Sequence, residues 1–489
     1  MVGSVAEGAD GSRRPDVLFD WLDRLPALVV GAALVALAFA AYWLPGTDRC
    51  YNHFVWQAMA FLDGRAAITW PVEGPFCSGL SNDWMQDVYP LREVTGDPST
   101  PGALLPFPPL PGILLMPFAA IWGLATDIRA VSVLFGAIDV GLAWWALGRL
   151  AISRRIRLAT TIFFAFGTAF WYAAQLGTTW FFAHVAAVTF LLLAVGVAFR
   201  ADPGADDEVE DGTDPVGAVR TLVAALRRPF ELIDRQQLLA GVLFGIACTA
   251  RLTVVFGAPF FMLVGGGGSW ARRSISAGIG AAIPVTLLLL YNLTTTGHLF
   301  HPGYDYQYQL EARGYQALGY NPDWSIEDAR YLPQNLGILF LTPPAVRPDH
   351  ELGAFGETDK AACTGTHTKR ALFDPHCPIV IPQAIGMSIV LTSPAFLLLI
   401  PALRRGRSRL VAGGFLAVMA IALVNLMHFS QGWVQFGYRF SNDFIVFALP
   451  LVAVGMSRRG RVGWLGIGLI GASVLINLWG VIWGNVLGW

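Results

Sequence analysis

Residues with chemically active side chains follow the first long apolar run of the chain. Asp48, Arg49 and Cys50 come just after that run, in the stretch YWLPGTDRCYNHF. A carboxylate can accept a proton from a substrate hydroxyl, and it is also an ordinary N-cap for a helix. Both interpretations of Asp48 stay open, because the apolar residues that follow it have a helical period.

Two further carboxylates, Asp83 and Asp87, lie in the stretch SNDWMQDVYPL. Their spacing places them on one side of a helix if the stretch is helical, and paired carboxylates can do acid–base chemistry. Acidic residues are also ordinary in an exposed loop. The spacing alone therefore does not choose between catalysis and solvation.

Two arginines lie within or beside apolar runs. A cation within such a run is costly, and a cation at its mouth is well placed to bind an anion. Arg251 interrupts the apolar run 237–265, at a cost of roughly 2.5–3.5 kcal/mol on membrane-insertion scales. It is expected to face a polar cavity or to reach the outer rim of the membrane. Arg439 stands at the mouth of a later apolar run, with Asp443 following it. Its guanidinium could bind a phosphate through paired N–H donors or simply pair with Asp443.

Aromatic residues add a second kind of candidate. Tyr304, Tyr306 and Tyr308 alternate with polar residues in GYDYQYQ, which predicts an extended segment. Their rings could stack against sugar rings or belong to an aromatic belt at the membrane surface.

The cysteines fall in pairs within two loops. Cys50 shares one loop with Cys77, and Cys363 shares another with Cys377. Two cysteines per loop fit one disulfide in each, in an oxidising compartment, with free thiols as the alternative. No cysteine or histidine spacing is typical of a zinc site, so the sequence predicts no metal site.

Apolar helices must position these residues. The chain has 489 residues, of which 55% are hydrophobic and 14% are charged, whereas a soluble protein carries about 25% charged residues. The net charge of −1 argues against nucleic-acid binding, which needs a basic field. Most of the surface is therefore expected to face a lipid bilayer.

Apolar runs long enough to cross about 30 Å of hydrocarbon recur along the chain. They are 25–45, 109–125, 130–148, 158–177, 180–199, 237–265, 276–293, 383–403, 410–428, 441–457 and 463–484. Arginine clusters between them favour the cytoplasmic side. All clusters reach that side if the Pro-rich run 109–125 stays on the outer face and 237–265 supplies two short spans. We therefore predict an all-α polytopic membrane protein with about eleven spans and outer-face juxtamembrane helices.

This topology divides the chain into the segments of a multi-pass protein. A composition rich in Ala, Gly, Arg and Trp suits a bacterial inner (plasma) membrane. The first apolar run is too long for a signal peptide and is interpreted as an uncleaved anchor. The segments are a cytoplasmic tail (1–24), a transmembrane module (25–293) with an external loop (46–128) and an acidic cytoplasmic loop (200–236), a large external loop (294–382), and C-terminal transmembrane helices (383–489).

Several stretches, in this order, resemble the GT-C membrane glycosyltransferases related to protein O-mannosyltransferases and the lipid A aminoarabinose transferase (glycosyltransferase family 39-like). The stretches are GTDRCYNHFVWQAMAFLDGR, PPLPGILLMPFAAIWG, GVLFGIACTARLTVVFGAPF, YNLTTTGHLFHPGYDY and FGYRFSNDFIVFALPLV. Each stretch is loose by itself, but their order covers nearly the whole chain.

The resemblance implies an activity. It is the transfer of a sugar from a polyprenyl-phosphate donor to a hydroxyl of a lipid, glycan or protein acceptor, on the extracytoplasmic side and with inversion. Asp48 matches the family's first-loop carboxylate, which acts as general base or places the acceptor. Arg439 matches an arginine that binds the donor phosphate, and Arg251 stands where members often have a basic residue near that phosphate.

The remaining expectations concern the substrate and the base. His53, Tyr304 and Tyr306 are expected to line the substrate. No cofactor is indicated with certainty, and a divalent cation stays an open alternative.

The chain departs from many members at the first-loop site, where they have two acidic residues. Arg49 follows Asp48 and could lower its basicity by pairing with it, in which case Asp83 or Asp87 is the alternative base. A transporter or flippase of lipid-linked sugars is the second functional hypothesis. It would use the same arginines, but the chain shows no internal duplication of the kind common in transporters.

Overall fold

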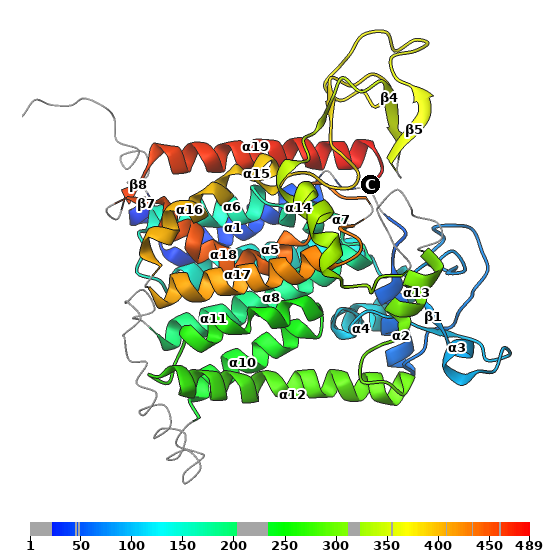
Figure 1. Ribbon diagram of the computed structural model, residues 1–489, viewed down its shortest axis with the longest axis horizontal. Helices are drawn as coiled ribbons and strands as arrows, with labels where there is room; N and C mark the ends of the chain where they lie inside the picture. The colour runs from blue at the N-terminus through cyan, green and yellow to red at the C-terminus, as the bar shows by residue number, and fades with distance from the viewer. Residues whose placement is uncertain are drawn as a thin grey trace, which may run out of the picture.

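The computed structural model describes residues 22–44, 46, 49–202, 233–311, 323–353, 356–406, 408–432, 434–458 and 461–489. Within these ranges the chain is mostly helical, and its long helices lie side by side as one bundle (Figure 1). One end of the bundle, here called the loop end, carries the short helices α2 (His53–Leu62), α3 (Leu91–Thr95), α4 (Leu110–Trp122) and α13 (Gly303–Glu311). The opposite end carries the strands β7 (Ser457–Arg458) and β8 (Arg461–Val462).

Five helices in the described ranges are long and apolar enough to cross a membrane. They are α5 (Ile128–Leu147), α8 (Thr179–Ala201), α12 (Trp270–Thr296), α17 (Arg409–Met427) and α19 (Trp464–Val486). The helices α6 (Arg154–Phe166) and α7 (Ala169–Leu176) meet at an angle of 52° and add a sixth if they form one span. This architecture fits a helical membrane protein, while about eleven spans stays a prediction.

Shorter apolar helices account for the other predicted runs. They are α1 (Ala27–Trp43), α4 with its continuation η2 (Gly123–Ala125), α10 (Arg235–Cys248), η4 (Leu252–Gly257) with α11 (Ala258–Leu263), and α18 (Ser441–Met456). The run 237–265 breaks after Cys248, next to Arg251, where the sequence suggested a break. The run 383–403 forms short pieces, α15 (Ile389–Thr392), η7 (Pro394–Leu398), α16 (Leu399–Ala402) and η8 (Leu403–Arg405). Pro394 follows the break at Ser393 and stands at the start of η7, where a residue without a backbone N–H is tolerated.

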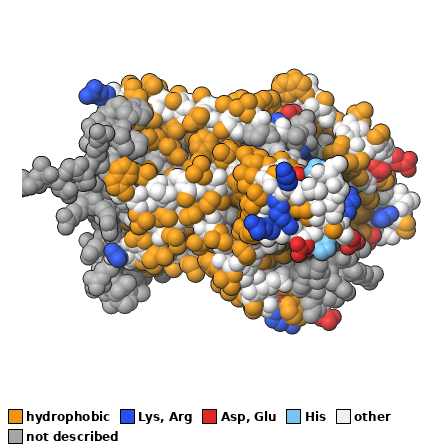
Figure 2. Space-filling model, turned by 90° about the horizontal axis from the view of Figure 1, so that it is seen from above, with side chains coloured by type: hydrophobic (Ala, Val, Ile, Leu, Met, Phe, Trp, Pro, Cys, Tyr) orange, Lys and Arg blue, Asp and Glu red, His pale blue; other side chains and the backbone are white. Residues whose placement is uncertain are grey.

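The outside of the bundle is apolar. Figure 2 shows hydrophobic side chains over much of the helical body, whereas charged side chains gather toward the loop end. Leu287 on α12 and Leu475 on α19 are 63% and 67% exposed. Long helices that leave large apolar side chains uncovered in this way are typical of a lipid-facing surface.

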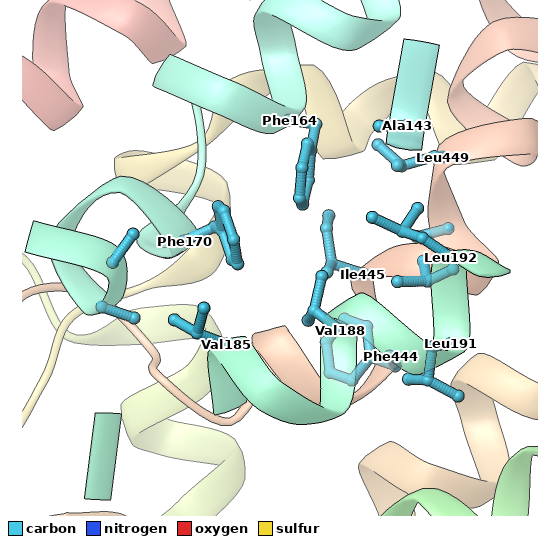
Figure 3. Close-up of a cluster of buried hydrophobic side chains, with 14 of the residues drawn as sticks. Ala143, Phe164, Phe170, Val185, Val188, Leu191, Leu192, Phe444, Ile445 and Leu449 are labelled. Atoms are coloured by element: carbon cyan, nitrogen blue, oxygen red, sulfur yellow. The ribbon is translucent and has the colours of Figure 1, made fainter. Parts of the chain in front are cut away.

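The core of the bundle is built around α8 and α18. Phe164 of α6 and Phe170 of α7 meet Val188 of α8 and Ile445 and Leu449 of α18 (Figure 3). All of these side chains are buried. Tight packing fixes the rotation of both helices about their axes, so the polar residues at their loop ends are held in defined positions.

The first external segment, predicted as 46–128, is held to the loop end by short elements. The strands β1 (Tyr89–Pro90) and β2 (Ala103–Leu104) pair antiparallel, α4 packs against α2, and a disulfide joins Cys50 to Cys77. In Figure 1, α4 lies at the loop end beside α2.

The described residues between 345 and 381 form a lobe at the loop end, where Phe373 packs against Trp483 of α19. The strands β3 (Ala345–Val346) and β6 (Val380–Ile381) pair antiparallel at its base, and β4 (His350–Gly353) pairs with β5 (Gly356–Ala361). A disulfide joins Cys363 to Cys377 inside the lobe. The short helices η6 (Ala329–Tyr331) and α14 (Leu332–Leu341) connect the lobe to the bundle.

The tyrosine-rich segment is not extended. Tyr304 and Tyr306 belong to the helix α13, so the prediction of a strand-like segment was wrong. Alternation of tyrosine with polar residues was a poor guide here, because α13 lies against other elements on more than one side. Gln307 is buried, and Tyr304 and Tyr306 pack against different aromatic neighbours. The side chain of Tyr308 lies outside the described residues.

Candidate anion-binding and acid–base site

A buried carboxylate, Asp443, forms the base of the site at the first turn of α18. Its Oδ1 accepts from His184 Nδ1 at 2.8 Å and from Arg251 Nε at 3.2 Å. Its Oδ2 accepts from Arg251 Nη2 at 3.0 Å, Thr253 Oγ1 at 2.8 Å and Asn425 Nδ2 at 3.1 Å. The side chain has no exposed surface. The donors come from α8, η4, α17 and the residue before η4, so one carboxylate fastens these segments together at the loop end.

Arg251 therefore has a structural partner. Its two-point pairing with Asp443 has the fork geometry that arginine makes with carboxylates. The side chain keeps 20% of its surface exposed, and its guanidinium carbon lies 5.4 Å from the centroid of the Phe440 ring. Arg251 is thus held by the protein on one side while its outer side stays accessible.

Arg439 lies beside Arg251 but is bonded differently. Its guanidinium carbon lies 5.0 Å from the centroid of the same Phe440 ring and 5.7 Å from that of Phe181. Its Nε is buried and, among the described residues, has no hydrogen-bond partner. No described side chain forms an ion pair with the guanidinium, and the expected alternative partner, Asp443, binds Arg251 instead. Arg439 is consequently a cation with donors available for an anion.

The surroundings of Arg439 favour anion binding further. Burial first, and then the neighbouring charge of Arg251, lower the pKa of Arg439 to about 10. The guanidinium therefore remains charged at neutral pH. Two guanidinium groups that share one ring repel each other, and an anion between them relieves that repulsion. The site is thus positive where it is accessible.

Asp87 brings a carboxylate to the same site. Its Oδ2 accepts from Trp180 Nε1 at 2.8 Å. Burial raises the pKa of Asp87 to about 6, although the Trp180 hydrogen bond and the charge of Arg439 act in the opposite direction. A carboxylate with such a pKa can accept a proton near neutral pH.

The backbone at Asp87 is also unusual. Its φ is 51°, in the left-handed region that residues other than glycine seldom adopt. With the Gln307 amide oriented to satisfy both groups, its carbonyl oxygen accepts from the backbone N–H of Asp87 at 3.2 Å and of Val88 at 3.0 Å. The helix α13 thereby fixes this conformation, as expected where a functional side chain is held in place.

Tyr304 and Tyr306 have different places at this site. Tyr304 interacts electrostatically with Arg251, Asp87 and Arg439, and burial raises its pKa well above the usual range. Its hydroxyl is therefore neutral and borders the site. Tyr306 packs against Tyr89, with ring centroids 5.4 Å apart, and lies farther out on α13.

His53 does not line an open surface, because its side chain is fully buried. Nδ1 lies 2.9 Å from Thr179 Oγ1, and Nε2 lies 3.0 Å from the carbonyl oxygen of Gln86. Burial lowers the pKa of His53 to about 4, so the ring is neutral. His53 connects the start of α8 to the residue before Asp87, and its predicted contact with substrate stays a prediction.

The other predicted carboxylates differ from Asp87. Asp83 is exposed, and residues 83–87 are not helical, so the two carboxylates do not share a helix face. The loop turns between them because Asn82 binds the backbone of Val72 and Thr69. Asp48 lies outside the described residues, and its predicted role stays a prediction.

Sequence reasoning missed His184, Thr253, Asn425 and Trp180. His184 and Asn425 lie inside apolar runs, where a polar residue is itself a signal. Nothing in the sequence, however, showed that both would meet Asp443. The described residues contain no group of three or more His, Cys, Asp or Glu side chains placed to hold a metal ion.

Comparisons with known proteins do not identify the chain. No family model, no curated protein and no solved structure matches the chain.

Proposed function

We propose that the chain is a membrane glycosyltransferase that moves a sugar from a polyprenyl-phosphate donor to an acceptor hydroxyl. One observation carries the proposal. Arg251 and Arg439, far apart in sequence, lie over one ring at the loop end, and Asp87 lies within electrostatic reach of Arg439. An anion site beside a proton acceptor is what displacement of a sugar from a phosphate requires.

The reaction follows from these groups. The acceptor hydroxyl oxygen forms a bond to the anomeric carbon, and the bond from that carbon to the phosphate oxygen breaks. The electron pair of the broken bond leaves with the lipid phosphate, whose added negative charge Arg439 and the accessible side of Arg251 stabilise. The hydroxyl proton passes to a carboxylate. Attack opposite the leaving phosphate inverts the anomeric configuration.

The pKa of Asp87, about 6, supports it as the proton acceptor, because that value suits transfer near neutral pH. The family resemblance assigns that role to Asp48. We therefore propose a general base in the first external segment, with these two carboxylates as the competing assignments.

The direct test uses the full-length protein in lipid vesicles. Polyprenyl-phosphate mannose and polyprenyl-phosphate arabinose are supplied separately with neutral glycoside acceptors, and released polyprenyl phosphate and new glycoside are both measured. Arg439→Ala is expected to slow release about 10²–10³-fold. Arg330→Ala is the matched control, because Arg330 is an exposed loop-end arginine paired with Asp328.

Two outcomes would contradict the proposal. If neither lipid phosphate nor glycoside forms with any donor, the chain is not this enzyme. If the intact donor instead crosses the vesicle membrane in an Arg439-dependent manner, the chain is a flippase for lipid-linked sugars.

A further inference from the structure

Beside Asp87 lies a group of aromatic rings that the reaction itself does not use. We call Tyr51, Trp84 and Trp180 the aromatic platform. The ring centroids of Tyr51 and Trp180 lie 4.9 Å apart, and those of Tyr51 and Trp84 lie 5.8 Å apart. All three residues are half-buried, and their ring planes meet at 75° and 57°, so the platform is an angled cluster and not one flat face. Phe76, whose ring centroid lies 4.9 Å from that of Trp84, is 62% exposed.

The platform is joined directly to the candidate base. Trp180 donates to Asp87 through its indole N–H, and Tyr51 interacts electrostatically with the same carboxylate. His53 supports the rings from the buried side, at 6.3 Å from Trp84 and 6.0 Å from Trp180 between centroids. A molecule lying on the platform would therefore have its edge next to Asp87.

Polar atoms without partners belong to one of these residues and to close neighbours of the other two along the chain. Trp84 Nε1, Asn52 Oδ1 and Thr178 Oγ1 are buried and have no hydrogen-bond partner among the described residues. Thr178 is 4% exposed, and the next residue, Thr179, donates to the Tyr51 carbonyl from both its backbone N–H and its hydroxyl. Such orphan groups normally need a partner, and a bound ligand or water can supply it.

The chemistry of this surface points to a neutral, hydroxyl-rich ligand. The orphan atoms include a donor, an acceptor and a hydroxyl that can be either, which matches groups that both donate and accept. None of the described cation–π contacts falls on the platform rings, so their faces are not covered by an arginine. A sugar ring combines an apolar face with a hydroxyl rim and fits both features.

We propose that the aromatic platform is the acceptor subsite and that the acceptor is a carbohydrate, whose attacking hydroxyl lies next to Asp87. This inference rests on the proposed function for the role of the bound sugar, but not for its binding. The donor sugar is the other candidate occupant. Because the donor phosphate belongs at Arg439 and Trp180 is bonded to the candidate base, the platform fits the acceptor better.

The test measures binding and turnover separately. Saturation-transfer NMR with the full-length protein in nanodiscs probes neutral methyl glycosides and short neutral oligosaccharides without any donor. We expect saturation transfer to the sugar-ring protons in the wild type and its loss in Trp84→Ala. In the transfer assay, Trp84→Ala and Phe76→Ala should raise the acceptor KM about tenfold or more and leave the donor KM within about twofold.

Two further variants distinguish a loss of sugar binding from a loss of folding. Trp122→Ala removes an exposed tryptophan from α4 at the same end (55% exposed) and should change neither measurement. Phe76→Ala alters an exposed ring, so it tests the platform even if Trp84→Ala does not fold.

Each outcome has a definite meaning. Sugar binding without any transferase activity would keep the platform and refute the proposed function. Transfer that is unaffected by the platform variants, a rise in the donor KM alone, or no saturation transfer to any glycoside would overturn the acceptor assignment.

Discussion

Arginine side chains are paired differently at the two ends of the bundle. At the opposite end, Arg409 donates to both carboxylate oxygens of Asp202, at 2.7 and 2.9 Å. Asp202 also accepts from the backbone N–H of Gly265. At the loop end, Asp443 satisfies Arg251 in a similar way, but Arg439 stands next to that pair with no described acceptor for its guanidinium.

This difference distinguishes an ion pair that stabilises the fold from charges that a ligand can use. A closed ion pair such as Arg409–Asp202 holds helix ends together and leaves little charge for a ligand. Both ends have a second arginine near the pair, but Arg273 at the opposite end donates to the Met262 carbonyl, whereas Arg439 Nε has no described partner. The loop end also adds a carboxylate with a raised pKa, Asp87. We infer that the extra charges, rather than the ion pair itself, mark the functional end.

The largest effect is expected from Asp87→Asn. Loss of a general base should slow transfer about 10²–10⁴-fold. In the wild type, Asp87 must be deprotonated to act, so activity should fall about tenfold per pH unit below about 6 and level off above it. Transfer rates from pH 4.5 to 8 test both statements, with Asp48→Asn compared in parallel. A large loss in Asp48→Asn together with an unchanged Asp87→Asn would assign the base to Asp48.

Arg439→Ala should have the next largest effect. Removing one preorganised donor to a developing anion costs about 10²–10³-fold in rate, and Arg439→Lys should recover part of it. Folding should change little, because the side chain makes no described ion pair. A similar loss of activity in Arg409→Ala, after correction for folded protein, would contradict the contrast between the two ends.

Asp443→Ala should mainly reduce stability. It leaves Arg251 without its partner at a largely buried position, which costs roughly 3–5 kcal/mol. Asp202→Ala should also destabilise the fold but leave the rate per folded molecule within about twofold. Denaturant unfolding and transfer assays on both variants measure the difference. Full stability in Asp443→Ala would show that the network does not fasten the helices.

The smallest effect is expected from Asp83→Asn. The side chain is exposed and has no described partner, so transfer should stay within about twofold of the wild-type rate. A loss as large as that of Asp87→Asn would mean that both carboxylates act in one step.

Much of the helical plan could be predicted because it depends on local composition. Apolar runs of about twenty residues and proline breaks are readable from the chain itself. The strand-like prediction for Tyr304 and Tyr306 failed because tertiary packing decided the conformation: α13 buries Gln307 against the Asp87 loop.

The site was harder to predict than the helices. Arg251 and Arg439 could be found because a cation within or beside an apolar run is costly. The partners of these arginines could not be predicted. In the sequence, Asp443 could have paired with Arg439, four residues before it, as well as with the distant Arg251. The packing of η4 against α17 and α18 settles that choice, because Arg251 directly precedes η4.

The lobe at residues 345–381 has a practical consequence for protein engineering. Its entry strand β3 and exit strand β6 are hydrogen-bonded neighbours, and its covalent cross-link, Cys363–Cys377, closes within it. The Asp443 network uses none of its residues. The lobe is therefore a natural unit for exchange between chains, and a chimera cut at β3 and β6 leaves the arginine pair intact while changing the surface that the chain presents at the loop end.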